Sequence, residues 1–155
     1  MGEKDSQYVT PFIHHISTIH LTDPQVKSGG HISIPKIYPP EGLLISMKQF
    51  NHIVYNKDTK TLDVGAGATW NDVYTFLDST EDYRKLGVVG AGPSVGVSGW
   101  LLGGGYSLLT NWHGLGIDNV VGFRVVTPNG PDLEGPTIRD ANPRENPDLF
   151  KALKV

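Results

Sequence analysis

The sequence predicts an α+β fold in which short strands and short helices follow one another without a regular strand–helix–strand repeat. Apolar runs of strand length alternate with turn residues, and only a few segments carry a helical period. The chain has 155 residues and 19 glycines, many of them gathered in two clusters. A chain of this length buries roughly 70% of its unfolded surface on folding, which is enough for the core of one domain.

The first half of the chain is expected to contribute mainly strands. Residues 1–25 show no clear hydrophobic period and are interpreted as a divergent N-terminal segment, followed by a domain over 26–155. The expected strands are the end of a short strand at 32–34, a strand over 43–47, and a hairpin that pairs 52–56 with 61–65 around the turn 57–60.

A helix is expected to begin after Thr69. Thr69 is a favoured N-cap residue, and Asp72 stands three residues later, in the position of a capping box. The segment has one apolar face at the spacing i, i+3, i+4 and i+7, formed by Trp70, Val73, Tyr74 and Leu77. This pattern predicts a helix that packs against the core.

The second half of the chain is expected to add two strands and two short helices. These are a strand over 86–89, a helix over 94–102, a strand over 119–127 and a helix over 147–154. Ser94 and Asn146 stand at the expected N-cap positions, and Pro147 follows Asn146 at the first helical position, where proline is favoured.

Composition argues against several classes of protein. The formal net charge is -3 and no basic run occurs, so the sequence offers no electrostatic case for binding nucleic acid or an anionic membrane. There is no cysteine, and no run of apolar residues has the length of a transmembrane helix or a signal peptide. His14, His15 and His20 have no carboxylate at ligand spacing, so no metal site is expected. Neither the compartment nor the oligomeric state follows from these observations.

Two familiar glycine motifs are also excluded. The segment Gly65-Ala-Gly67 resembles the start of a Rossmann fingerprint, but Trp70 occupies the place of its third glycine and prevents close helix–strand packing. The segment 96–99 is one residue short of the nucleophile elbow of serine hydrolases.

The segment Ser28-Gly29-Gly30-His31 is the most informative motif. Two consecutive glycines let a loop turn tightly and present bare backbone N–H groups to an anion. The imidazole of His31 follows at once, which places a nucleophilic nitrogen beside the ligand. A second glycine cluster, over 87–105, is too rich in glycine for an ordinary helix or strand. Together they predict a backbone that approaches a large, flat or phosphorylated ligand.

Six stretches of the chain resemble the FAD-binding, PCMH-type domain of the vanillyl-alcohol oxidase family, and within it the berberine-bridge-enzyme-like FAD-linked oxidoreductases. They occur in the family's order and are VKSGGH (26–31), GLLISMKQFNHI (42–53), LDVGAGATWNDVY (62–74), VVGAGPSVGVSGWLLGGGYSLL (88–109), HGLGIDNVVGFRVVTPNG (113–130) and ENPDLFKALK (145–154). The resemblance implies a partial FAD-binding domain with an incomplete first subdomain and no substrate domain. Residues 1–25 and the insertion 131–136 depart from the family pattern.

The resemblance implies a cofactor site built from both glycine clusters. His31 corresponds to the histidine that forms the covalent 8α bond to FAD, while the N–H groups of Ser28, Gly29, Gly30 and His31 would cup the diphosphate. The start of the helix expected at Ser94 would offer further N–H groups. The other implied cofactor contacts are Gly90, Gly92, Pro93, Ser94, Val95, Gly96, Gly99, Gly104, Gly105, Asn119 and Val120. Some relatives form a second bond from a cysteine at the position of Gly92, which this chain cannot form.

The function implied by the resemblance is that of an FAD-linked oxidoreductase of secondary metabolism. Its flavin would accept a hydride from a small organic substrate and be reoxidised by oxygen. The resemblance assigns no catalytic base, because in the family that residue belongs to the substrate domain. His52 and His113 are interpreted as structural. Two alternatives remain open: an inactive, truncated remnant of such an enzyme, and a glycine-rich binding module without enzymatic activity.

Overall fold

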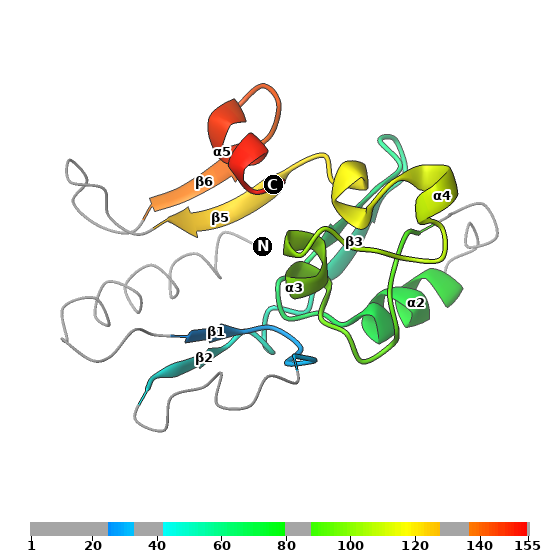
Figure 1. The fold of residues 1–155 in the computed structure, drawn as a ribbon, viewed down its shortest axis with the longest axis horizontal. Helices are drawn as coiled ribbons and strands as arrows, with labels where there is room; N and C mark the ends of the chain where they lie inside the picture. Colours follow the sequence, from blue (N-terminus) through cyan, green and yellow to red (C-terminus); the bar gives the residue numbers. More distant parts are fainter. Residues whose placement is uncertain (1–24, 33–41, 80–87, 128–136, 155) are drawn as a thin grey trace.

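The computed structural model describes residues 25–32, 42–79, 88–127 and 137–154, and its mixture of short strands and helices confirms the expected α+β class (Figure 1). The elements in chain order are β1 (Gln25–Lys27), β2 (Leu44–Ser46), β3 (Ile53–Asn56), β4 (Thr61–Val64), α2 (Trp70–Asp78), α3 (Val97–Leu102), α4 (Thr110–His113), the 3-10 helix η2 (Gly116–Asn119), β5 (Phe123–Thr127), β6 (Thr137–Ala141) and α5 (Pro147–Ala152).

The described strands form three two-stranded sheets. β1 and β2 are parallel, whereas β3 pairs with β4 and β5 pairs with β6 in antiparallel fashion. The predicted hairpin and the predicted strand over 43–47 are therefore confirmed. In the hairpin turn, the side-chain oxygen of Asn56 accepts hydrogen bonds from the N–H groups of Asp58 and Thr59, at 3.0 and 3.1 Å. This side chain fixes the turn and hence the register in which Ile53 faces Val64.

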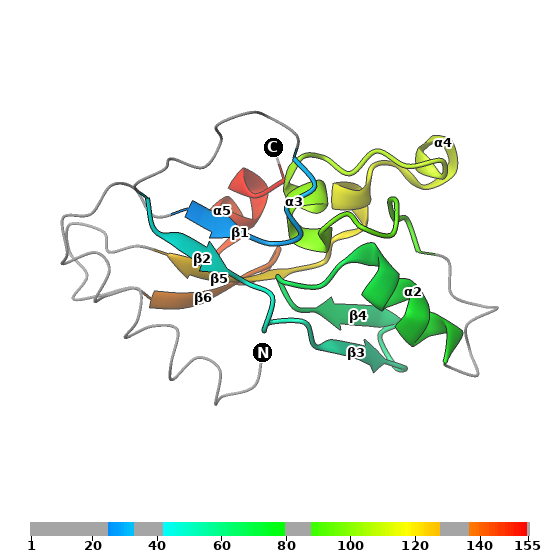
Figure 2. The ribbon, with the colours of Figure 1, turned by 90° about the horizontal axis from the view of Figure 1, so that it is seen from below.

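Helix α2 packs on the β3–β4 hairpin, beside which it lies in Figure 2. Its buried face is the predicted one: Trp70, Val73 and Leu77 are at most 4% exposed and form the core with Val97. The capping box is also confirmed, because the Thr69 N–H donates to the Asp72 carboxylate at 2.8 Å and the Asp72 N–H donates back to the Thr69 hydroxyl at 3.4 Å. The capping box and the core packing of α2 both favour the same helix, so α2 is the element around which the described core is built.

The helix predicted over 94–102 begins three residues late, at Val97, and its N-cap is Gly96, not Ser94. The reason is a long-range one. The N–H groups at the start of α2, on Trp70 and Asn71, donate to the carbonyls of Val95 and Pro93, both at 3.0 Å. These bonds hold the backbone before α3 extended, with φ -69° and ψ 131° at Gly96.

The strand predicted over 119–127 also begins late, at Phe123. Residues before it form the short helix η2, because the Asp118 carboxylate accepts from the Leu115 N–H at 2.9 Å. The Asn119 amide donates to the carbonyls of Leu115 and His113, at 2.9 and 3.0 Å. These local hydrogen bonds compete successfully with a strand.

Two further expected strands are wrong where they can be compared. Val88 and Val89 have no regular secondary structure, and the rest of the strand predicted over 86–89 lies outside the described residues. Ile32 is likewise irregular, while 33–34 lie outside the described residues. The adjoining strand is instead β1, which precedes the Ser28 loop.

The C-terminal unit consists of β5, β6 and α5, which lie together at the top of Figure 1. Arg124 and Asp140 pair across the two strands, with 2.7 Å between Nε and Oδ1. The rings of Phe123 and Phe150 lie 5.9 Å apart and join α5 to the sheet. Helix α5 begins at Pro147 with Asn146 at the N-cap position, as predicted, but the Asn146 side chain makes no capping hydrogen bond. The φ of Asn146 is 49°, and its side-chain amide donates to the Asp140 carbonyl.

Candidate functional site: a loop of free backbone amides

The loop 28–31 leaves the carboxyl end of β1. Its entry is fixed by the parallel pairing of β1 with β2, which is extended by a hydrogen bond from the Met47 N–H to the Lys27 carbonyl at 2.8 Å. Gly30 has a φ of 83°, a conformation that favours glycine. None of the four N–H groups of the loop donates to another described residue. Such a run of free amides is suited to hold an anion.

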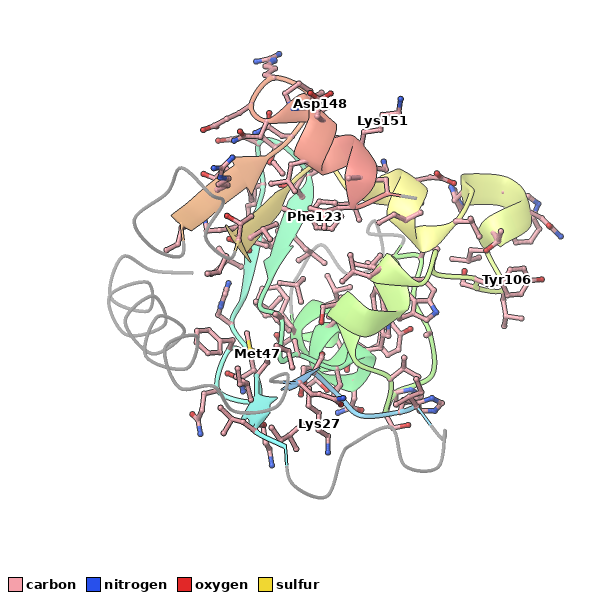
Figure 3. All side chains as sticks on the ribbon, turned by 60° about the vertical axis from the view of Figure 1, so that its left-hand side comes forward. Lys27, Met47, Tyr106, Phe123, Asp148 and Lys151 are labelled. Carbon is pink, nitrogen blue, oxygen red and sulfur yellow. The ribbon has the colours of Figure 1, made fainter. Side chains whose placement is uncertain are left out.

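Lys27 adds a positive charge to this loop, and the sequence reasoning missed it. A Cβ placed on Gly30 would collide with the Lys27 Cε, and its distance to the Lys27 ammonium nitrogen would be 3.1 Å. The side chain therefore folds over Gly30, as its position beside the loop in Figure 3 illustrates. The signal in the sequence is a lysine directly before the glycine loop, where an ammonium can pair with a bound phosphate.

The two glycine clusters meet at Gly29 and Gly96. A Cβ on Gly96 would lie 2.5 Å from the Gly29 nitrogen, and a Cβ on Gly29 would lie 2.6 Å from the Gly96 nitrogen. The two main chains thus touch directly. Of the predicted cofactor residues, the structure brings Ser28 and Gly29 together with Ser94 and Gly96. Beside this contact, Gly92, Pro93 and Ser94 are exposed.

The Ser28 hydroxyl lies at this contact. Its Oγ would be 2.7 Å from a Cβ on Gly96, and this buried oxygen has no hydrogen-bond partner among the described residues. A buried hydroxyl without a partner costs free energy, on the order of 1–3 kcal/mol. A phosphate held by the adjoining amides could supply the missing partner.

Gly90 and Gly99 have different surroundings. Gly90 faces the core, because a Cβ there would collide with the Tyr74 hydroxyl and with the ring of Trp70. The same Tyr74 hydroxyl donates to the Ala91 carbonyl at 2.6 Å, which holds the segment against α2. Gly99 lies inside α3, and nothing stands within 4 Å of a Cβ placed on it.

The remaining predicted residues form a second group around η2. Gly104 and Gly105 have φ values of 93° and 77°, and their carbonyls accept hydrogen bonds from the N–H groups of Ile117 and Gly116. Asn119 is the last residue of η2, and Val120 follows it. The glycine loop after α3 is thereby joined to the segment that ends at Asn119.

Trp100 packs between α2 and the glycines at positions 105 and 116. Its ring meets that of Trp70 edge to face, with 5.0 Å between centroids. A Cβ on Gly105 or on Gly116 would collide with the same ring. Trp100 is therefore a partly buried residue that packs against the core, whereas Trp112 is 79% exposed on α4.

His31 is exposed at the end of the amide loop. Within the described residues, no group of three or more histidine or acidic side chains could hold a metal ion. The loop thus combines free amides, an ammonium group, an unpartnered hydroxyl and an accessible imidazole. These features fit the diphosphate of a dinucleotide cofactor. They indicate a protein of the class that binds a phosphorylated cofactor on an α+β scaffold.

Comparison with protein families indicates that the cofactor is FAD. Residues 24–133 match the FAD binding domain family, so the chain belongs to that family. It is 41% identical over 153 residues to the FAD-dependent monooxygenase yanF of Aspergillus niger, covering 97% of this chain and 25% of the relative. It is 40% identical over 133 residues to the FAD-dependent monooxygenase macF of Penicillium terrestre, covering 83% and 24%. The chain therefore spans about a quarter of the length of these relatives.

Solved structures show the same fold. Aclacinomycin oxidoreductase matches with a TM-score of 0.79 and 26% identity, over 96% of this chain and 30% of that one. BBE-like 1 of Physcomitrella patens matches with a TM-score of 0.67 and 29% identity, over 84% and 27%. Glucooligosaccharide oxidase of Acremonium strictum, whose FAD is described as 6-S-cysteinyl and 8α-N1-histidyl, matches with a TM-score of 0.62 and 27% identity, over 84% and 26%. The resemblance to PCMH-type FAD-binding oxidoreductases is confirmed.

The lengths of the described helices bear on whether one of them could span a membrane. In the ranges that the structure describes, no helix is both long and apolar enough to cross a bilayer.

Proposed function

We propose that this chain forms the FAD-binding part of an FAD-linked oxidoreductase of secondary metabolism that acts on a small organic substrate. The observation that carries the proposal is the loop 28–31, whose four backbone N–H groups donate to no described residue, on the scaffold of an FAD-binding family. When bound, FAD supplies the redox chemistry, accepting a hydride from the substrate and passing electrons to oxygen. The fungal relatives named as FAD-dependent monooxygenases support an FAD-dependent oxidoreductase.

In this proposal the chain's own residues hold the diphosphate. The amides of 28–31 donate to its oxygens, the Lys27 ammonium neutralises part of its charge, and the Ser28 hydroxyl gains the partner that it lacks in the protein alone. The second group of residues, around Gly105 and Asn119, is proposed to hold the remainder of the cofactor.

We further propose that His31 carries the cofactor covalently. The imidazole is exposed and follows the amide loop directly, and glucooligosaccharide oxidase, with a similar fold, is described with a histidyl FAD. A ring nitrogen of His31 would bond to the 8α carbon. Forming this bond would remove one hydrogen from the imidazole and one from the 8-methyl group, and dioxygen would be the oxidant that takes up both. Since Gly92 has no thiol, a single bond is expected.

The first test is the visible absorbance of the purified protein, followed by flavin fluorescence of its band after denaturing electrophoresis. We expect a yellow protein whose fluorescence survives denaturation. His31→Ala should lose the fluorescent band, because no other described residue of the loop offers a nucleophilic ring nitrogen. His113→Ala is the matched control: it also removes an exposed histidine, on α4, and should keep the band.

Two results would contradict the proposal in different ways. A colourless protein that takes up no FAD on refolding would contradict the FAD-binding role itself. A yellow protein that releases all of its flavin on denaturation would contradict only the bond to His31.

A further inference from the structure

We infer that Gly96 is a positioning residue for the loop that carries His31. Its contact with Gly29 determines the position of this loop relative to α2. The inference deepens the proposed FAD site and rests on it. It assigns to one glycine of the second cluster a role that does not require any contact with the cofactor.

The contact is reciprocal and involves main-chain atoms on both sides. A Cβ on Gly96 would lie 2.5 Å from the Gly29 nitrogen and 3.0 Å from the Gly29 Cα. A Cβ on Gly29 would lie 2.6 Å from the Gly96 nitrogen and 2.8 Å from the Gly96 Cα. Real Cβ atoms essentially never approach other atoms closer than 3.0 Å, so alanine at either position requires a main-chain shift. No flexible side chain is available to yield in its place.

Gly96 is the fixed side of this contact. The residues on either side of it are bound to the start of α2: the Trp70 N–H donates to the Val95 carbonyl, and the Val97 N–H donates to the Ala68 carbonyl, both at 3.0 Å. Gly96 itself forms a β-bridge with Thr69. Trp70 and Val97 are each 4% exposed and belong to the core, so this frame cannot move without disturbing the core.

The loop 28–31 is the movable side. Its N–H groups make no hydrogen bond to described residues, and Gly30 and His31 are exposed. A Cβ at position 96 therefore displaces the loop and not α2. The displacement needed to restore ordinary contact is about 1 Å, which is enough to lower the efficiency of a positioned group roughly 100-fold.

The test compares Gly96→Ala, Gly29→Ala, the double variant and a matched control, Gly122→Ala. A Cβ on Gly122 meets its nearest neighbours at 3.5 and 3.6 Å, in ordinary contact. FAD affinity and the fraction of covalently bound flavin are measured for each protein. In addition, amide chemical shifts are compared without FAD for residues 28–31 and for α2.

We expect each single variant to weaken FAD binding and attachment at least tenfold, and Gly122→Ala to change neither. The loss in the double variant should differ from the product of the two single losses, because both positions lie in one contact and coupled positions do not add. Without FAD, the signals of 28–31 should move while those of α2 stay in place, which a general loss of structure would not produce.

Undiminished FAD binding by folded Gly96→Ala or Gly29→Ala overturns the inference. Gly29→Ala serves where Gly96→Ala does not fold, since Gly29 lies on the loosely held side. If the unaltered protein binds no FAD, the proposed function fails, but the chemical shifts still decide the inference. Shifts confined to 28–31 uphold the contact, and unchanged shifts overturn it.

Discussion

Different kinds of contact stabilise two regions of the molecule. One region is the pair of loops that forms the candidate site, and the other is the C-terminal unit of β5, β6 and α5. At the loops, Gly29 meets Gly96 main chain to main chain, and the hydrogen bonds that fix this geometry run from the start of α2 to backbone carbonyls. In the C-terminal unit, side chains make the contacts, through the pair Arg124–Asp140 and the rings of Phe123 and Phe150. A backbone contact admits only glycine, whereas contacts between exposed or half-buried side chains tolerate substitution.

The largest difference is expected when the same truncation is made in α2, which holds the segment before Gly96, and in the C-terminal unit. Leu77 on α2 is 1% exposed, so Leu77→Ala should lower the free energy of unfolding by about 2–5 kcal/mol. Leu149 on α5 is only half-buried, and Leu149→Ala should cost about 1 kcal/mol. Urea denaturation measures both values. Equal losses would contradict the view that the described core is built around α2.

A smaller effect is expected at the ion pair of the C-terminal unit. The hydrogen bond from Arg124 lowers the pKa of the Asp140 carboxyl. This stabilisation is present above the carboxyl's unfolded pKa, near 3.9, and is lost as the pH falls through the lower folded pKa. Because the two side chains are 48% and 42% exposed, the pair should contribute at most about 1 kcal/mol.

Arg124→Met should therefore lower stability slightly at neutral pH, and the difference should shrink as the pH falls below about 4 toward the lowered pKa of Asp140. The measurement is the free energy of unfolding as a function of pH. Arg144→Met is the matched control, since Arg144 is exposed and the hydrogen bond from its backbone N–H to the Asn142 side chain is kept by the substitution. An equal effect of both substitutions would show that the pair contributes nothing specific.

The same contrast explains what the sequence could predict. The hairpin of β3 and β4 and the start of α2 were predictable, because Asn56, Thr69 and Asp72 act on residues within three positions of themselves. The start of α3 was not, because it depends on hydrogen bonds from α2 to Pro93 and Val95, more than twenty residues away. Ser94 is a good N-cap by type, and the tertiary bonds outweigh that preference.

The candidate site follows the same rule. The motif 28–31 is visible in the sequence because its glycines and histidine are adjacent. Its contact with Gly96 joins positions far apart in the chain and could not be read from spacing. Lys27 could have been predicted from its place before the loop, but its fold over Gly30 depends on the positive φ of that glycine. The residues implied around η2, such as Asn119, stay predictions.

The most direct test of the central claim, that the backbone of loop 28–31 and Lys27 hold the diphosphate of FAD, compares two ligands. The His31→Ala protein, which cannot form the covalent bond, is titrated with FAD and with riboflavin, which has the same ring system but no phosphate, and binding is followed by flavin fluorescence. The account predicts that FAD binds at least tenfold more tightly than riboflavin, since only FAD engages the free amides and the ammonium group. Equal affinity for the two ligands would contradict it.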